Sequence, residues 1–168
     1  AEKEVRFDLL SDPWQSNLHF VFQVYVDSKD RAWFATDGNG VFCIAGDQVV
    51  QYSGDDSLKL KTVYSVCEDH NGHVWLNTAD QGLIEFDGTT YKPLGVKEGL
   101  GNLTMASINT CGTGDIVITH AKGIDLMEPA RRHFMYYKEE IGIEDLTPGL
   151  NASTVNSRGH VYTSGQNK

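Results

Sequence analysis

The sequence repeats with a period of 42 residues, and this repeat limits the possible folds more than any other feature of the chain. When the sequence is shifted by 42 positions, six of the 23 residues between positions 24 and 46 meet an identical residue. The repeated residues pair as Val24 with Val66, Asp27 with Asp69, Trp33 with Trp75, Thr36 with Thr78, Gly40 with Gly82 and Gly46 with Gly88. Two weaker copies follow, one with Val117 in place of the tryptophan and one that begins near Ala152. The chain is therefore expected to use one small structural unit about four times.

Each copy divides into short apolar strands separated by turn residues. In the second copy, Asn71-Gly72 predicts a type I′ turn, because both central residues of such a turn need positive φ. The four strands expected in this copy are 63–67, 74–78, 83–86 and 91–94. Four short antiparallel strands in roughly 40 to 45 residues are typical of a β-propeller blade. The apolar run at 20–26 agrees, since a sheet covered on both faces does not alternate between polar and apolar residues.

The predicted fold class is all-β: a partial propeller of about 3.5 four-stranded antiparallel blades. Propellers close with roughly four to eight blades, so we expect a fragment of a larger propeller, or two copies that cover each other's open faces. The expected division is 1–19 for the last strand of a preceding blade and its connection, 20–60 and 61–102 for two blades, 103–147 for a degenerate blade and 148–168 for the start of a truncated blade. A turn of helix is considered only for 139–146, where Gly142 weakens it.

Composition excludes several classes of partner. The net charge of −9 disfavours nucleic acid, which needs clustered Lys and Arg, and the longest apolar stretches are too short to span a bilayer. The chain contains no C-x-x-C motif, so a structural zinc site is not expected. We expect Cys43, Cys67 and Cys111 to be small apolar residues that fill space within strands.

The motifs of the second copy resemble the two-component regulator propeller repeat. The resemblance is carried by Val66 to Thr78 and by Gln81 to Gly88, with a similar copy at Val24 to Gly46. Gly123 to Pro129 resembles the ending of the family's repeat, whereas Val117 and His120 depart from its usual Trp and Thr. The resemblance covers nearly the whole chain from about residue 20.

This resemblance implies a function in signal transduction. It implies the periplasmic sensor region of a bacterial membrane histidine kinase, as in Bacteroidetes-type hybrid two-component systems, with about seven blades in the complete propeller. Such a module binds a small molecule, a carbohydrate in many of these sensors, and passes the signal to a kinase and phosphorelay that this chain lacks. The expected location is extracytoplasmic, in a membrane-anchored parent, with a possible homodimer and no cofactor.

The family's ligand site is expected on the face of the disc that carries the loops after the second strands and the connections between blades. Sugar recognition favours an aromatic ring beside amide and carboxylate groups. The candidate binding residues are Trp14, Asp37, Asn39, Asp80, Gln81, His120 and Lys122. The competing interpretation is that they are ordinary polar loop residues. Trp33 and Trp75 are expected in the core between blades, and Asp27 and Asp69 are expected to accept hydrogen bonds from turn amides.

No catalytic motif occurs, and the chain is not expected to be an enzyme. His70 and His73 lie across a turn, so a metal site is not expected there. The first alternative is a propeller enzyme of the lyase or lactonase type, whose metal ligands lie on the inner strands or at their ends. Those strands offer no His or acidic cluster here, but only Gln23, Tyr25, Ser65, Ser107 and Asn109. The second alternative is a purely structural dimerisation module.

Overall fold

The computed structural model describes residues 20–138, 142 and 147–165. These residues form strands and turns with one short 3-10 helix, η1 (Val96–Glu98), and no α-helix occurs among them. The strands are β1 (Val21–Val26), β2 (Ala32–Thr36), β3 (Val41–Ala45), β4 (Gln48–Tyr52), β5 (Val63–Glu68), β6 (Val74–Thr78), β7 (Leu83–Phe86), β8 (Tyr91–Leu94), β9 (Met105–Thr110), β10 (Ile116–His120), β11 (Gly123–Glu128), β12 (His133–Tyr137), β13 (Pro148–Val155) and β14 (Val161–Gly165).

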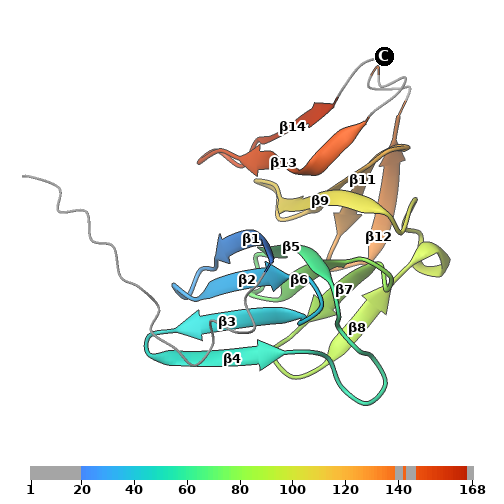
Figure 1. Ribbon diagram of the computed structural model, residues 1–168. Coiled ribbons are helices and arrows are strands. Elements are labelled where there is room, and N and C mark those ends of the chain that lie inside the picture. Colours follow the sequence, from blue (N-terminus) through green and yellow to red (C-terminus); the bar gives the residue numbers. More distant parts are fainter. Residues whose placement is uncertain (1–19, 139–141, 143–146, 166–168) are drawn as a thin grey trace, which may run out of the picture.

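The strands form three four-stranded antiparallel sheets and one two-stranded sheet, each built from strands that are consecutive in the sequence. We call them blades one to four: β1 to β4, β5 to β8, β9 to β12, and β13 with β14. The first strands of the blades are neighbours, since β5 contacts both β1 and β9, and β9 contacts β13 (Figure 1). The remaining strands extend outward from this line (Figure 1). This radial arrangement of four-stranded meanders confirms the predicted all-β propeller fold.

The first and second strands of every blade are joined by the same turn. In blade two, the amide of Asp69 donates to the carbonyl of His73 and the amide of Gly72 donates to the carbonyl of Asp69. The fourth residue of the turn has positive φ in all four blades: Asp30, Gly72, Gly114 and Gly159. The type I′ prediction was wrong, because only Gly72 of the Asn71-Gly72 pair has positive φ, at 82°. The connection is instead the longer hairpin loop that ends in one left-handed residue.

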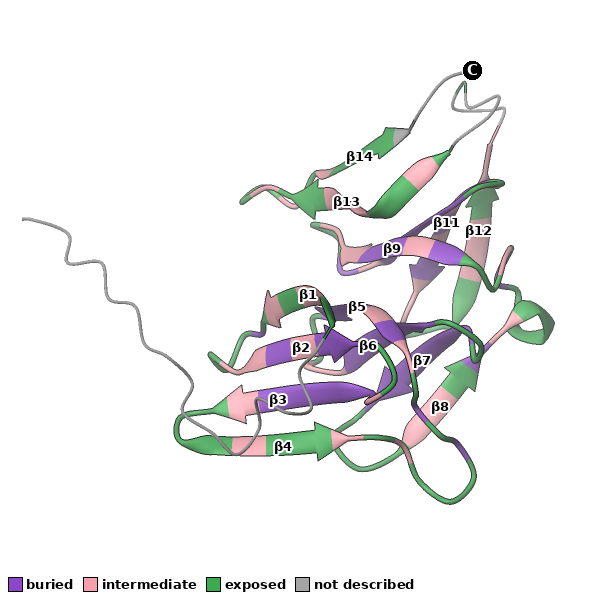
Figure 2. Cartoon of the chain, in the orientation of Figure 1, coloured by how far each residue is buried: buried purple, intermediate pink, exposed green. Residues whose placement is uncertain are grey.

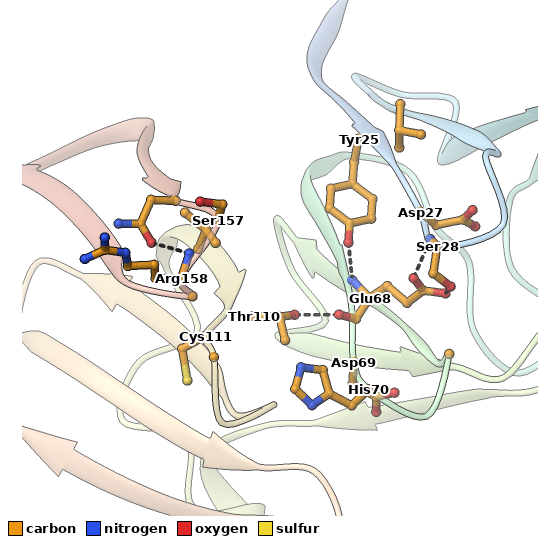
Figure 3. Close-up of a pocket in the computed structure, with 16 residues that line it drawn as sticks. Tyr25, Asp27, Ser28, Glu68, Asp69, His70, Thr110, Cys111, Ser157 and Arg158 are labelled. Carbon is orange, nitrogen blue, oxygen red and sulfur yellow. Dashed lines mark hydrogen bonds between the residues drawn. The ribbon is translucent and has the colours of Figure 1, made fainter.

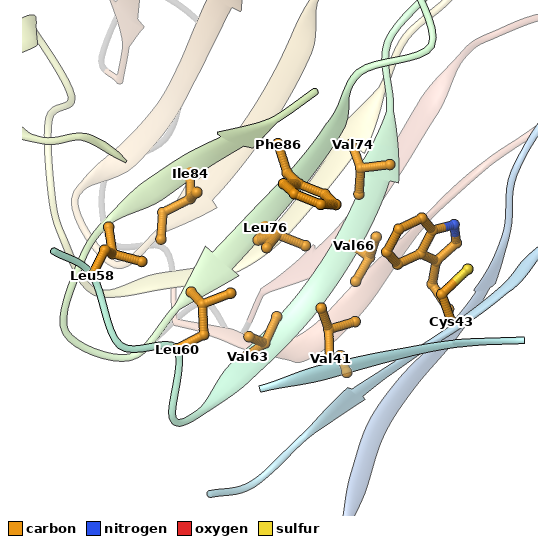
Figure 4. Close-up of a cluster of buried hydrophobic side chains, with 12 residues drawn as sticks. Val41, Cys43, Leu58, Leu60, Val63, Val66, Val74, Leu76, Ile84 and Phe86 are labelled. Carbon is orange, nitrogen blue, oxygen red and sulfur yellow. The ribbon is translucent and has the colours of Figure 1, made fainter. Parts of the chain in front are cut away.

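Packing between blades forms the core. One cluster joins blade one to blade two and includes Trp33, Val41, Val66 and Leu76 (Figure 4). A second cluster joins blades two and three around Trp75, whose side chain is fully buried. Every residue of β6 and β7 is buried, because blade two is covered on both faces (Figure 2). This explains why these strands show no period-two alternation.

Two of the three cysteines fill the core as expected, and one does not. Cys43 in β3 and Cys67 in β5 are buried, and burial raises the pKa of the Cys67 thiol to about 12. Cys111 instead follows β9 in the turn and is only half-buried, so its assignment to a strand was wrong. The strand expected at 5–9 and most of the segment 139–146 lie outside the described residues. Within the described segments, no helix has the length and apolar character needed for a membrane span.

Candidate functional site

The connections between blades and the loops after the second strands lie on one face, which we call the mouth face. The amide of Asp37, in the loop after β2, donates to the carbonyl of Phe20, and the amide of Ala79, after β6, donates to that of Thr62. The Thr62 hydroxyl also donates to Asp37 Oδ1 at 2.8 Å. The face predicted for ligand binding is therefore formed by short, tied loops.

The predicted binding residues are spread along this face. Asp37, Asp80 and Gln81 are exposed in the loops after β2 and β6, and Asn39 is half-buried. The carbonyl of Asn39 accepts a hydrogen bond from Gln51 Nε2 at 3.0 Å, which ties this loop to β4. Trp14 lies outside the described residues. The structure thus brings neighbours within each loop together but does not gather the loops into one cluster.

His120 lies in the interior, unlike the other candidates. Its side chain is fully buried, with Nε2 at 3.2 Å from Asp125 Oδ2, and its Nδ1 accepts a hydrogen bond of 3.2 Å from the amide of the exposed Lys122. Asp125 Oδ2 also accepts a bond of 2.8 Å from the amide of Gly101 in the connection from blade two. The His120 imidazole therefore joins the loop after β10 to this connection. The sequence did not predict a role for Asp125. The one signal is that His120 stands where the first two copies have Thr36 and Thr78, so this histidine needs a different partner.

A cavity of about 320 Å³ opens on the mouth face between blades two, three and four. It is lined by strand beginnings and loops: Tyr64, Thr104, Met105, Ala106, Ala121, Thr147, Pro148 and Leu150. Ala121 lies in the sequence between two of the predicted binding residues, His120 and Lys122, neither of which lines the cavity. Sequence reasoning therefore identified the face and one neighbouring loop, but it did not identify the residues that form the hollow.

A larger cavity of about 740 Å³ lies on the opposite face, where the four hairpin turns converge (Figure 3). Glu68 is central to it, because its Oε2 accepts a 2.7 Å hydrogen bond from the amide of Ser28 and its carbonyl accepts a 2.6 Å bond from the Thr110 hydroxyl (Figure 3). The amide of Glu68 donates to the Tyr25 hydroxyl at 3.2 Å. Burial, together with nearby negative charge, raises the pKa of Tyr25 to about 12. The polar groups of Glu68 are thus used to connect blades one, two and three.

The repeated aspartates serve their own turns. Asp27 Oδ1 accepts hydrogen bonds of 2.9 Å from the amides of Lys29 and Arg31, and its Oδ2 accepts from the indole nitrogen of Trp33 at 2.8 Å. Burial opposes ionisation of Asp27, but the hydrogen bonds from Trp33 and from the turn outweigh it and lower the pKa of this carboxyl. The Thr36 hydroxyl donates to the carbonyl of Gly40 at 2.8 Å, and Thr78 does the same to Gly82 at 2.7 Å. In the described part of the chain, no three His, Cys, Asp or Glu side chains are grouped to hold a metal ion.

The fold defines a class of protein: the described blades are those of a β-propeller, arranged side by side. A family model described as the two component regulator propeller matches residues 57–80, which confirms the resemblance for the second copy of the repeat. A search of curated proteins gave no match.

Several solved structures share the fold of this chain. The extracellular domain of a hybrid two component system from B. thetaiotaomicron is 25% identical over 88% of this chain, with a TM-score of 0.71. A second such domain from the same organism is 20% identical over 86% of this chain, with a TM-score of 0.72. This chain spans only 21% and 22% of those two proteins. A virginiamycin B lyase from Staphylococcus aureus shares the fold at 18% identity over 87% of this chain and 49% of the lyase, with a TM-score of 0.68.

Proposed function

We propose that the chain is part of an extracytoplasmic propeller that binds a small molecule, most suitably a carbohydrate, and signals to a histidine kinase elsewhere in its parent protein. The observation that carries the proposal is the match of blade architecture and sequence to the extracellular domain of a hybrid two component system at 25% identity. The family model at residues 57–80 supports the same assignment. The chain itself performs no chemistry in this proposal.

The complete propeller is proposed to contain further blades, about seven in all. Val24 in β1 is 55% exposed, whereas Val66 and Ile108, at the same repeat position in β5 and β9, are each 1% exposed. The two buried residues are covered by the preceding blade, and the face of blade one that carries Val24 lacks such a cover in the described structure. Exposed apolar surface of this kind favours a covering partner. A preceding blade, or a second copy of the chain, would supply that cover.

The mouth face is the proposed site of ligand binding. Asp37, Asn39, Asp80, Gln81 and Lys122 are proposed to donate and accept hydrogen bonds with sugar hydroxyls from the loops around the mouth. On the opposite face, by contrast, the carboxylates of Asp27 and Glu68 are buried as well as hydrogen-bonded to the protein, whereas Asp37 remains exposed although it accepts a bond from Thr62. The mouth face therefore has the more accessible polar groups.

A glycan array followed by titration calorimetry tests the proposal. Binding of at least one glycan to the chain is expected, and Gln81→Ala should weaken it by about 2- to 10-fold, the value of one neutral hydrogen bond. Gln48→Ala, which changes an exposed residue of the outer strand β4, is the matched control and should leave the affinity unchanged. Failure of every glycan to bind would leave a structural module as the better interpretation. Metal bound tightly to the purified parent protein would instead favour an enzyme related to the lyase.

A further inference from the structure

Three inner strands carry a β-bulge at the same repeat position. The pairing of β1 with β2 skips the residue between Val21 and Gln23, and the pairing of β5 with β6 skips the residue between Val63 and Ser65. The pairing of β9 with β10 skips the residue between Met105 and Ser107. The bulged residues are Phe22, Tyr64 and Ala106, which are 42 residues apart. A bulge leaves its residue outside the ladder and redirects the side chain, and bulges are frequent beside binding sites.

The first two bulges carry aromatic rings that contact each other, and the third does not. The rings of Phe22 and Tyr64 meet edge to face, with centroids 5.1 Å apart. The next member of the series is Ala106, and Tyr64 and Ala106 both line the cavity of the mouth face. The hollow therefore lies where a third ring would continue the series. Its size suits a single ring-shaped molecule.

Two asparagines, neither of them a lining residue, hold the backbone of two residues that line this cavity. Asn151 in β13 donates from Nδ2 to the carbonyl of Tyr64 at 2.8 Å, and Asn77 in β6 donates from Nδ2 to the carbonyl of Met105 at 3.3 Å. The Oδ1 atoms of both asparagines are buried without a hydrogen bond among the described residues. Buried acceptors of this kind are unfavourable unless a donor reaches them.

The cavity also has a defined charge preference. None of its eight described lining residues is charged, so it offers no cation to a carboxylate or sulfate and no anion to an amine. The net charge of −9 further disfavours an anionic ligand through the field of the whole chain. A neutral ligand with an apolar face is the remaining class.

We propose that this cavity binds a neutral, ring-shaped molecule that packs an apolar face on Tyr64. Within the carbohydrates this means a neutral sugar ring and not a uronic acid or a sulfated sugar. This inference rests on the proposed sensor function for its carbohydrate class, but the site itself is assigned from the bulges and from the uncharged cavity beside them.

The three methionines provide a direct measurement. Met105 lines the cavity, whereas Met127 and Met135 are not among the lining residues, so methyl-labelled methionine gives one reporter and two internal controls. The probes are methyl β-glucoside, its charged counterpart methyl β-glucuronide, and benzyl alcohol as a neutral ring that is not a sugar. With millimolar dissociation constants expected for such small probes, methyl β-glucoside and benzyl alcohol should shift the Met105 signal selectively, and the glucuronide should not.

A pair of loop variants adds a matched control. Ala121→Phe should fill the cavity and weaken neutral-probe binding by about tenfold or more. Ala79→Phe changes the same loop position of blade two, outside the cavity, and should leave binding unchanged. The methionine spectrum of each variant shows directly whether it remains folded.

Each outcome separates the site from the sensor function. A Met105 shift with benzyl alcohol but with no sugar supports the cavity and overturns the carbohydrate part of the proposed function. Sugar binding that leaves Met105 unchanged preserves the sensor function and overturns this site. A stronger Met105 shift with the glucuronide than with the glucoside overturns the neutral class, and no Met105 shift with any probe overturns the inference as a whole.

Discussion

The indole nitrogen of Trp75 donates a hydrogen bond of 3.1 Å to the carboxylate of Asp69, and the equivalent bond, 2.8 Å long, joins Trp33 to Asp27. In each case the carboxylate closes the turn with one oxygen and holds the core tryptophan with the other. The turn and the packing between blades are thus coupled through one side chain. This coupling explains why the aspartate and the tryptophan are repeated together.

Blade four reverses the polarity of the same contact. Asn156 replaces the aspartate, and its Oδ1 still accepts hydrogen bonds from the amides of Arg158 and His160. Its Nδ2 is a donor, and it meets the Tyr162 hydroxyl at 3.2 Å instead of an indole N–H. In blade three, Cys111 and Val117 replace both partners, so the carboxylate and the indole are lost together.

Replacing the carboxylate beside a tryptophan should therefore destabilise the fold. The indole of Trp75 and the amides of Asn71 and His73 all donate to the Asp69 carboxylate. In Asp69→Asn, one of the two carboxylate oxygens becomes an NH₂ group, which is itself a donor. At least one of the three donors therefore loses its acceptor. We expect the free energy of unfolding to fall by about 1 to 3 kcal/mol in urea titrations. The matched control is Asn156→Asp, which should change it by less than about 0.5 kcal/mol, because a tyrosine hydroxyl can donate to a carboxylate. Equal losses in the two variants would contradict the polarity argument.

The turns of blades three and four touch through glycine backbones. The amide of Gly112 donates to the carbonyl of Gly159 at 2.9 Å, and a Cβ on Gly159 would lie 2.2 Å from the Cα of Gly112. Gly159→Ala should cost at least about 3 kcal/mol of unfolding free energy, since it combines a backbone clash with strain at φ +77°. Gly46→Ala has a similar φ of +58° but open space around it, and it should cost only about 1 kcal/mol. Comparable costs in denaturant unfolding would show that the two turns are not in contact.

An ion pair connects the outer parts of blades two and three. The guanidinium of Arg132 contacts Glu85, a buried carboxylate that also lies 3.1 Å from His73 Nδ1. Arg132→Gln should lower the free energy of unfolding by about 1 to 2 kcal/mol, less than for a fully buried pair because the arginine is half exposed. Arg131→Gln removes a more exposed contact to Glu128 and should have an effect close to zero. The prediction fails if thermal and urea unfolding do not distinguish the two variants.

Acid should destabilise the fold through carboxylates whose pKa is lowered. Burial opposes the charge of Asp27, but its hydrogen bonds lower its pKa, and hydrogen bonds from Thr90 and Thr89 lower the pKa of Asp87. A carboxyl with a lower pKa in the folded state stabilises it above the unfolded pKa of about 3.9, and this contribution is lost as the pH falls toward the folded value. The free energy of unfolding should therefore decrease from about pH 5 downward. The double variant Asp27→Asn with Asp87→Asn should show a shallower decrease, and an unchanged slope would refute the assignment.

The blades could be predicted well because their signals are local. A period of 42 residues, turn residues at fixed offsets and apolar strands specify each four-stranded sheet within one stretch of sequence. The burial of Trp33 and Trp75 followed from their repeated position, since repeated aromatic residues on strands are placed in a core. The turn type was mistaken because Asn71-Gly72 satisfies two kinds of hairpin loop, and the chain uses the one with a single left-handed residue.

The candidate site was predicted only in part, because its geometry depends on several blades at once. The mouth face and the loop around Ala121 follow from strand order, whereas the buried state of His120 depends on Asp125 and on a connection from another blade. The sequence by itself determined the repeat, the strands and the residues that close each turn, because these interactions lie within about 40 residues. Only the tertiary structure decided that the bulge at Ala106 opens a cavity beside Tyr64, because a hollow exists only where side chains distant in sequence fail to fill the space between them.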